Sequence, residues 1–562
     1  MVRLLLIGLA ALAGCYAPEL TDCRVRCGPG DSCPAELACR DGFCVHPGLD
    51  GGCSAPCAVD CTPGAARCGD GGVERCAEAG DCPTWSAESA CTGATPVCVA
   101  SLARCGCDDR ACAASHQDCD GMSGACVTCA PSPMPESRAD FYVDPTTTGL
   151  VTGSLGCPYR TITAALIAAR QSSAANKTIH LAAGTYDQET LPLVLRGGIS
   201  VVGPGRDRTL IAGVGQFDHQ AQGGFAAGSD YLVTVVIGDD SGLERLAGVR
   251  LESRVTATAG VIGVFCDQGT TTQLGSSPPP ANVVLDNVEV HSSYDKGVLV
   301  TNSTSSGCNL ALTDTIVYDA LVGVELAGCD AAGVGKPVAA RLGDGTAAGT
   351  CNFGGSQRSL HMGDCVAALE LQRDTFAFPV QLSPHQAESL IVVEDSAFNG
   401  GDFGLLVENQ ALVARLRGCQ FGLANFGSAL WIRDDARIAL ARQNQLYANR
   451  TGLRIDGSPV TAAREMDFGR VEDPGGNIFR CNSANVSSPD TGYDVVLAVA
   501  AGSTEALRFD GNAWDHAPPS ASTSATAPNG TDLVSLSAAP APAVTTDGAT
   551  VSTLPCPPQL DP

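Results

Sequence analysis

Two pairs of adjacent aspartates have the residue types that acid–base chemistry requires: Asp239-Asp240 and Asp434-Asp435. Hydrolysis of a glycosidic bond uses two carboxyl groups, one protonated as the acid and one ionised as the base. Neighbouring residues of a strand point to opposite faces, so adjacency in the sequence does not bring two carboxyl groups into one site. A segment such as Gly238 to Gly242 is also typical of a turn. Both pairs are therefore candidate catalytic residues, but we favour their interpretation as turn residues.

Two mixed clusters contain the residue types of a polysaccharide lyase, which needs a base for the sugar C5 proton and a cation near the uronate carboxylate. They are Arg433, Asp434, Asp435 and Arg437, and His291, Tyr294, Asp295 and Lys296. Neither cluster matches a known lyase motif, and mixed charge is also typical of a solvated surface. Scattered acids can bind Ca²⁺, but the sequence contains no EF-hand and no glycine-aspartate nonapeptide repeat. We therefore predict no cofactor, with Ca²⁺ left unsupported by a motif.

Cysteines are concentrated near the N-terminus. Nineteen of the 29 lie between Cys23 and Cys129, which in an exported chain indicates a disulfide framework. Zinc is the competing interpretation for Cys126 and Cys129, but a second close pair or histidine partners are missing. Without Cys15, nineteen and nine cysteines remain in the two regions, both odd numbers. Either one bridge joins the regions, with Cys157 as the nearest candidate, or each region keeps at least one free thiol.

The first residues predict export. An apolar run from Leu4 to Ala13 suits a signal peptide and is too short to span a bilayer comfortably. It ends in Leu12-Ala13-Gly14-Cys15, which resembles the bacterial lipobox. That resemblance implies a signal peptide over residues 1–14, acylation of Cys15 and anchoring in the cell envelope. Tyr16, in place of an aspartate, favours the outer membrane or cell surface. The alternative is an ordinary signal peptide followed by a chance cysteine.

Composition restricts the partners. The net charge is −26 and charged residues make up 17% of the 562 residues. Such acidity repels phosphate backbones, so nucleic acid is excluded as the main partner. The hydrophobic fraction of 44% indicates that most of the chain is folded.

Cysteine-rich modules are predicted over residues 15–130 and a Pro-rich linker over residues 131–139. The modules resemble those of myxobacterial surface lipoproteins. A new unit begins at residue 140. In it, Ile162, Ala165, Leu166 and Ala169 have helical spacing, with Thr161 or Thr163 as the cap. Strands are expected at residues 178–181, 193–195 and 199–203, with a turn at residues 183–186.

This unit resembles an uncharacterised bacterial family of the pectin-lyase-like superfold. The resemblance lies in three segments: residues 158–166, 178–181 and 183–186. It implies a right-handed parallel β-helix whose short N-terminal helix caps the open end of the first coil. No catalytic residue is implied, because the matching motif contains none.

A repeated phrase supports the same fold independently. Glycine or alanine followed by alternating aliphatic residues begins at residues 297, 323, 404, 429 and 452, with offsets of 26, 81, 25 and 23. Since 81 is three times 27, the period matches one solenoid coil. Each coil can bury its aliphatic side chains only by stacking on its neighbours. The sequence therefore predicts an all-β solenoid over residues 140–517.

Other features are expected to be structural. Asn287, Asn399, Asn449 and Asn477 lie near turns and are expected to form ladders. Residues 328–390 fit the period poorly and indicate a coil with a long insertion, in which Cys351 and Cys365 can close a loop. Residues 518–562 are rich in Ala, Pro, Ser and Thr, which predicts a loosely ordered tail pinned by Cys556.

The predicted function is that of a surface-anchored lipoprotein whose β-helix binds or displays a ligand such as a glycan. Its expected partners are the membrane, through the lipid, and a polysaccharide. The alternatives are a polysaccharide lyase or glycoside hydrolase on the same scaffold, and a purely structural rod. The fold does not decide among them, so catalysis remains open, with a non-catalytic role favoured.

Overall fold

The structure is a computed structural model that divides into two units, residues 1–128 and residues 129–562. It describes residues 26–556 except 35, 41, 49–60, 70–71, 80–81, 93–96, 100–103, 108, 114–116, 121–124, 130–136, 219–229, 239–242, 257–259, 267–280, 302–307, 328–337, 356, 365, 386–388, 423–426, 483–491 and 529–530. The predicted signal peptide, Cys15 and most of the predicted linker lie outside these residues. Among the described helices, none has the length and apolar character needed to cross a membrane.

The first unit consists of short antiparallel hairpins joined by disulfides. Its elements are β1 (Ala38–Arg40), β2 (Phe43–Val45), β3 (Ala66–Gly69), β4 (Gly72–Ala79), β5 (Cys82–Ala90), β6 (Val97–Val99), β7 (Arg104–Gly106), α1 (Asp109–Ala113), β8 (Gln117–Asp120) and β9 (Ala125–Thr128). Seven described bridges lie within it: Cys27–Cys39, Cys33–Cys44, Cys61–Cys76, Cys68–Cys98, Cys91–Cys105, Cys107–Cys119 and Cys112–Cys126. These bridges compensate for a core too small to stabilise such hairpins alone.

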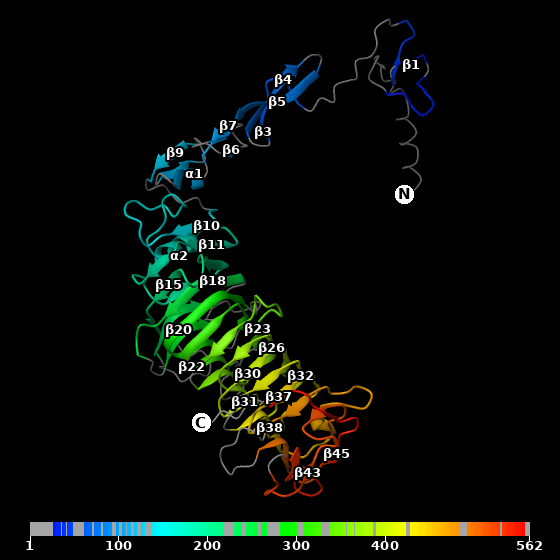
Figure 1. Cartoon of the computed structure of the whole chain (residues 1–562). Coiled ribbons are helices and arrows are strands. Elements are labelled where there is room, and N and C mark those ends of the chain that lie inside the picture. The colour runs from blue at the N-terminus through cyan, green and yellow to red at the C-terminus, as the bar shows by residue number, and fades with distance from the viewer. Residues whose placement is uncertain are drawn as a thin grey trace, which may run out of the picture. The chain divides into compact units, whose positions relative to one another are not determined.

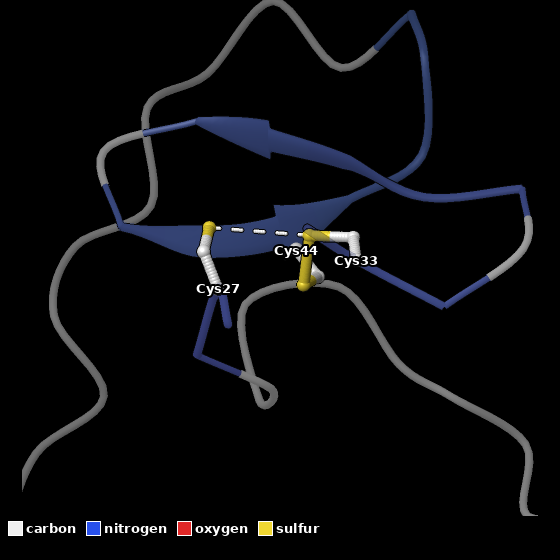
Figure 2. Close-up of side chains that lie close together, drawn as sticks. All are labelled: Cys27, Cys33 and Cys44. Atoms are coloured by element: carbon white, nitrogen blue, oxygen red, sulfur yellow. Dashed lines mark hydrogen bonds between the residues drawn. A yellow bond between two sulfur atoms is a disulfide. The ribbon is translucent and has the colours of Figure 1, made fainter. Parts of the chain in front are cut away.

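The disulfides also occupy the sulfurs that a metal would need. Figure 2 shows Cys27 beside the Cys33–Cys44 bridge, with the Sγ atoms of Cys27 and Cys33 3.9 Å apart. Cys27 itself is bonded to Cys39. The CxxC pair that raised the zinc alternative is divided in the same way, because Cys126 is bonded to Cys112 and Cys129 to Cys157.

The second unit is a right-handed parallel β-helix. Figure 1 shows its strands succeeding one another from β10 in cyan through β20 in green to β45 in red. Most strands pair in parallel with the strand one coil later, and three such stacks form three faces, which we call faces A, B and C. An exception is β16 (Gly215–Asp218), which pairs antiparallel with β17 (Asp230–Ile237). Long strands such as β20 pass through a corner and belong to more than one face.

Face A contains β10 (Asp140–Val143), β11 (Lys177–Leu181), β14 (Ile199–Val202), the start of β18 (Leu243–Glu252), the start of β20 (Ala281–Thr301), β21 (Cys308–Thr313), β23 (Val338–Leu342), β26 (Val366–Gln372), β29 (Leu390–Glu394), β32 (Leu412–Arg417), β35 (Arg437–Ile438) and β36 (Ala441–Arg442). Face B contains β12 (Gly184–Tyr186), β15 (Thr209–Ala212), the end of β18, the middle of β20, the start of β22 (Ile316–Ala327), β24 (Asn352–Gly354), β27 (Thr375–Phe376), β30 (Ala397–Asn399), β33 (Gln420–Gly422), β37 (Gln445–Tyr447), β39 (Ile478–Arg480), β42 (Ala513–Trp514) and β46 (Thr550–Val551). Face C contains β13 (Leu193–Leu195), β17 (Asp230–Ile237), β19 (Val261–Cys266), the ends of β20 and β22, β25 (Arg358–Met362), β28 (Val380–Leu382), β31 (Phe403–Val407), β34 (Ser428–Ile432), β38 (Thr451–Gly457), β40 (Tyr493–Val499) and β44 (Leu533–Ser535).

The repeated aliphatic phrase marks one face. All five of its copies lie on face C, in register, so that Leu405 pairs with Leu430 and Leu430 with Leu453. The long offset of 81 residues contains two further strands, β25 and β28, which make up three coil steps as predicted. Val324 pairs with Leu360, so this step takes 36 residues and contains the expected insertion.

An amphipathic helix packs at the N-terminal end, as predicted. In α2 (Ile162–Gln171), Ile162, Ala165, Leu166 and Ala169 are buried. The Thr161 hydroxyl caps the helix by accepting a hydrogen bond from the Ala164 amide at 3.2 Å. The Glu189 carboxylate accepts hydrogen bonds from the first two backbone amides of the helix, those of residues 162 and 163, at 2.8 Å each. The helix thereby covers core residues that the first coil would otherwise expose.

Aromatic rings form a continuous column inside face B. The rings of Phe353, Phe376, Phe398 and Phe421 stack with centroids 5.3, 5.1 and 4.7 Å apart, and all four are almost fully buried. They occupy equivalent positions of four successive coils, because the strands pair in register. The interior of the solenoid is therefore filled by like residues placed one above another.

Asparagine ladders fix two corners of the solenoid. Asn444, Asn477 and Asn512 are buried and donate side chain to side chain, at 2.9 and 3.0 Å. Asn449 and Asn482 form a second ladder at 3.2 Å. Each amide can both donate and accept, so the chain of bonds satisfies polar groups that are cut off from water. The ladder prediction is confirmed for Asn449 and Asn477 and missed three of the members. Asn287 and Asn399 belong to neither of these two ladders.

The structure corrects several expectations about the chain. The predicted tail contains β43 (Ala521–Ser522), β44, β45 (Val544–Thr545) and β46, and β44 and β46 continue the stacks of faces C and B. Low hydrophobicity therefore did not mean disorder, because parallel pairing with the preceding coil orders these strands. The predicted turn at residues 183–186 contains strand β12, whose Tyr186 is buried in the core.

The cysteines of the second unit are partly as expected. Cys129 is bonded to Cys157, which is the first of the two predicted alternatives, a bridge between the two regions. Cys556 is bonded to Cys481, so the C-terminal segment is pinned through Cys556 as expected, to a partner that was not predicted. Cys266 is bonded to Cys308. The loop-closing bridge proposed for Cys351 is wrong, because this cysteine is free and buried; Cys365 lies outside the described residues. Burial raises the pKa of the Cys351 thiol to about 12, so it packs as a small apolar group.

Candidate functional site

Six polar residues converge on the outer surface of face B. We call them the His291 cluster: Arg250, Glu252, Glu289, His291, Tyr318 and Asp319. They come from β18, β20 and β22, three strands stacked in parallel on face B, so positions distant in sequence become neighbours. Leu251 and Val290, which lie between them, and Val317, which precedes Tyr318, are buried in the core. The alternation of the strands therefore turns the polar side chains outward.

Arg250 lies at the centre of the cluster. Its guanidinium contacts Glu252 at 2.6 Å and Glu289 at 3.3 Å. It also donates to Nδ1 of His291, whose Nε2 lies 3.2 Å from Asp319. Since Nδ1 accepts, the imidazole carries its proton on Nε2 and donates to the aspartate. Both ring nitrogens are therefore occupied.

Tyr318 completes the cluster as a hydrogen-bond donor. Its ring lies over that of His291, with centroids 4.2 Å apart, and its hydroxyl donates to Glu289 at 2.8 Å. Burial and then the bond to Glu289 raise the pKa of Tyr318 to about 12. The phenol therefore stays protonated at neutral pH and cannot serve as a base in this arrangement.

The charge of the cluster decides which ligands suit it. Three carboxylates face one guanidinium, and Arg250 is already shared by two of them. The side chain of Asp319 is 64% exposed, whereas that of Glu289 is only 14% exposed. The surface therefore presents many acceptors and a few donors to solvent and repels anions. Hydroxyl-rich neutral molecules fit this pattern, because each hydroxyl can donate as well as accept.

The predicted lyase cluster around His291 is not one site. Tyr294 is buried, and its hydroxyl lies 2.9 Å from that of Thr234. Asp295 accepts from the Gly260 amide at 3.0 Å. The Lys296 ammonium lies on face C, 2.6 Å from Glu325. The bend between β20's stretches on faces B and C separates these residues from His291, which explains why sequence proximity was misleading.

Lys296 belongs to a second polar group, on face C. Glu325 lies between its ammonium and Nδ1 of His361, which is 3.6 Å away. Burial opposes ionisation of Glu325, but the hydrogen bond from His361 and the positive charge of Lys296 lower its pKa to about 2. The three groups satisfy one another, so we assign this group a structural role.

The aspartate pair 434–435 forms part of a corner between faces C and A. Asp434 has a left-handed φ of 59° and lies 3.4 Å from the Arg433 guanidinium. The Asp435 amide donates to the Asn409 carbonyl of the preceding coil at 2.9 Å. Arg437 donates to the carbonyl of Ala463. These contacts fit the turn interpretation of the pair; Asp239 and Asp240 lie outside the described residues.

A separate basic pocket lies beside the capping helix. Arg170, Lys177 and Arg196 line it together with Val194 and Gly197, and its volume is about 550 Å³. Arg170 donates to the Val194 carbonyl and Lys177 to that of Gly197. Positive charge gathered in an otherwise acidic protein suits an anionic group, in contrast to the His291 cluster.

Sequence reasoning missed most of the His291 cluster. The signal was the pattern of a polar residue at every second position, as in Arg250 and Glu252 or Glu289 and His291. Each pair alone resembles an ordinary solvated strand. Only the pairing of Arg250 with Glu289 and of His291 with Tyr318 brings them together, and that register is a property of the folded coils.

A family model matches part of the second unit. The model of a family described as a protein of unknown function (DUF1565) matches residues 147–274, which include all three segments on which the predicted resemblance depends. No curated protein matches the sequence.

Solved structures with a similar backbone trace include the A-module of the mannuronan C-5 epimerase AlgE6 of Azotobacter vinelandii. The sequence identity is 14%, the match covers 71% of this chain and 95% of that chain, and the TM-score is 0.40. The A-module of AlgE4 from the same organism has 14% identity, coverages of 70% and 93%, and a TM-score of 0.31. ORF18 of Geobacillus virus E2 has 12% identity, coverages of 79% and 64%, and a TM-score of 0.23. At these identities, no activity is transferred to this chain.

Proposed function

We propose that the protein is a lipoprotein of the bacterial cell envelope whose β-helix binds a neutral glycan across the His291 cluster. The observation that carries the proposal is the alignment of six hydrogen-bonding side chains from three strands stacked on one outer face. A parallel solenoid continues the same face over many coils, which suits an extended polymer. The lipobox-like segment ending at Cys15 and the disulfide-rich first unit support an envelope location.

Binding fits the cluster better than lyase chemistry does. A lyase needs a cation for the uronate carboxylate, but Arg250 is paired with Glu252 and Glu289. It also needs a base with a free site, but both nitrogens of His291 have partners. A hydrolase needs one carboxyl group set apart as the proton donor, and Glu252 and Glu289 share the same guanidinium. The enzyme alternatives therefore require the cluster to rearrange.

Glycan binding is tested with the chain from residue 16 onward. We expect it to be retained on immobilised neutral polysaccharides, to be eluted by the same polymer in solution, and to leave that polymer's length unchanged. Release of unsaturated products from an acidic polysaccharide would instead establish a lyase. Shortening of a neutral one would establish a hydrolase.

The anchor makes a separate prediction. The variant Cys15→Ala removes the thiol that would carry the acyl chains, each of which contributes about 0.8 kcal/mol per buried methylene. We expect the wild-type chain to remain with the membrane fraction and the variant to be recovered in the soluble fraction, as measured by immunoblotting. Cys419→Ala serves as the control, because Cys419 is a buried free cysteine of the second unit. Membrane association of both variants would contradict the anchor.

A further inference from the structure

Three aspartates meet at the C-terminal end of the β-helix. Asp494 is in β40, Asp515 follows β42, and Asp532 precedes β44. One carboxylate oxygen from each lies within 4.8 Å of the others. The three residues come from different strands and are joined at the corner between faces B and C.

Two of these carboxylates are buried with an oxygen that has no partner. Asp494 and Asp532 are 3% and 1% exposed. Oδ1 of Asp494 accepts from the Asn482 amide at 2.8 Å, and Oδ2 of Asp532 accepts from the Ser520 amide at 2.6 Å and lies 2.9 Å from Nδ1 of His516. Among the described residues, the other oxygen of each, Oδ2 of Asp494 and Oδ1 of Asp532, has no hydrogen-bond donor. Leaving a buried charged oxygen unpaired is costly, so these atoms point to a missing partner.

The asparagine ladder shows why the partner must be positive. Asn449 donates to Asn482, and Asn482 donates to Asp494. Up to this point each side chain both accepts and donates. An ionised carboxylate has no hydrogen to donate, so the next contact, between Asp494 and Asp532, brings two hydrogen-bond acceptors together. A cation or a proton is needed between them.

We propose that Asp494, Asp515 and Asp532 bind one divalent cation of the Ca²⁺ class. Carboxylate oxygens are the preferred ligands of Ca²⁺, which completes its shell with carbonyl oxygens and water. Arg480 lies 3.5 Å from Asp515, so three carboxylates face one guanidinium and leave negative charge in excess when no ion is bound. A divalent cation cancels that excess.

The competing explanation is a single proton. Burial and the neighbouring aspartates raise the pKa of Asp494 well above its usual range. A protonated Asp494 could therefore donate to Asp532 with no metal present. The two explanations differ in whether Ca²⁺ is taken up and whether its removal changes stability.

The test uses the purified full-length chain, stripped with EDTA and titrated with Ca²⁺ by calorimetry, with Mg²⁺ in parallel. We expect one Ca²⁺ per chain and a Tm at least about 3 °C higher in ~1 mM Ca²⁺ than in EDTA. Asp532→Asn should abolish both effects. Asp547→Asn, a substitution of an exposed aspartate in the same region, should leave both unchanged.

Asp515→Asn is a second variant, because the side chain of Asp515 is 23% exposed and its loss threatens folding less. We expect at least tenfold weaker Ca²⁺ binding in this variant. Absence of Ca²⁺ uptake by the folded wild-type chain, with the same Tm in EDTA and in Ca²⁺, would overturn the proposal in favour of the proton. Uptake that persists in both Asp532→Asn and Asp515→Asn would place the ion elsewhere and overturn it as well.

Discussion

Replacement of Phe398 by alanine is expected to destabilise the β-helix by about 3–5 kcal/mol. The ring is 1% exposed and lies between Phe376 and Phe421, with centroid distances of 5.1 and 4.7 Å. Its removal leaves a cavity that successive coils cannot close, because the backbone hydrogen bonds of β30 to its neighbours fix the coil spacing. Each neighbouring ring loses a stacking partner in addition to the lost burial.

Chemical denaturation followed by circular dichroism measures this change. Phe378→Ala is the matched control, since Phe378 lies two residues after the neighbouring column member Phe376 but is 37% exposed. We expect its effect to stay within about 0.5 kcal/mol. Similar destabilisation by both variants would mean that the stacked column does not carry the stability assigned to it here.

The solenoid could be predicted from the sequence because its signals are local and repeated. The phrase that begins at residue 404 or 429 places a small residue first and aliphatic residues at the second and fourth positions, and the same face recurs one coil later. The capping helix could be predicted for the same reason, since Thr161 and the spacing of its apolar residues lie within one short segment. Because the coils stack in register, such local patterns determine the fold directly.

What could not be predicted depends on register between coils. Asn444 and Asn512 resemble ordinary turn residues until the coils align them with Asn477. The aspartate cluster has the same origin, because its members lie 21 and 17 positions apart along the chain, on different strands. The insertion near residue 343 lengthens one coil, so a fixed period applied to the sequence loses the alignment there. Sites assembled across coils therefore emerge only with the folded structure.

Arg250→Gln is expected to weaken glycan binding roughly 10–150-fold, which corresponds to the loss of about 1.5–3 kcal/mol from a charged hydrogen-bonding group. Arg250 is the one described residue of the cluster that contacts Glu252, Glu289 and His291 together. Glutamine is shorter than arginine and carries no charge, so the two glutamates repel each other and the imidazole loses its fixed orientation. The ligand-binding surface is then lost without removal of any core residue.

Folding and binding can be separated in this variant because the side chain of Arg250 is 33% exposed, and ion pairs at such positions contribute only about 0–1 kcal/mol to stability. Arg415→Gln is the matched control: it breaks an equivalent ion pair, with Glu394 at 2.7 Å, on face A. Dissociation constants for a neutral polysaccharide, measured for the folded wild type and the two folded variants, then identify the face that binds the glycan.

If Arg415→Gln weakens binding and Arg250→Gln does not, the glycan binds along face A. If only acidic polymers bind, and Arg170→Gln abolishes their binding, the basic pocket beside the capping helix is the site, and the charge argument for a neutral ligand on face B fails.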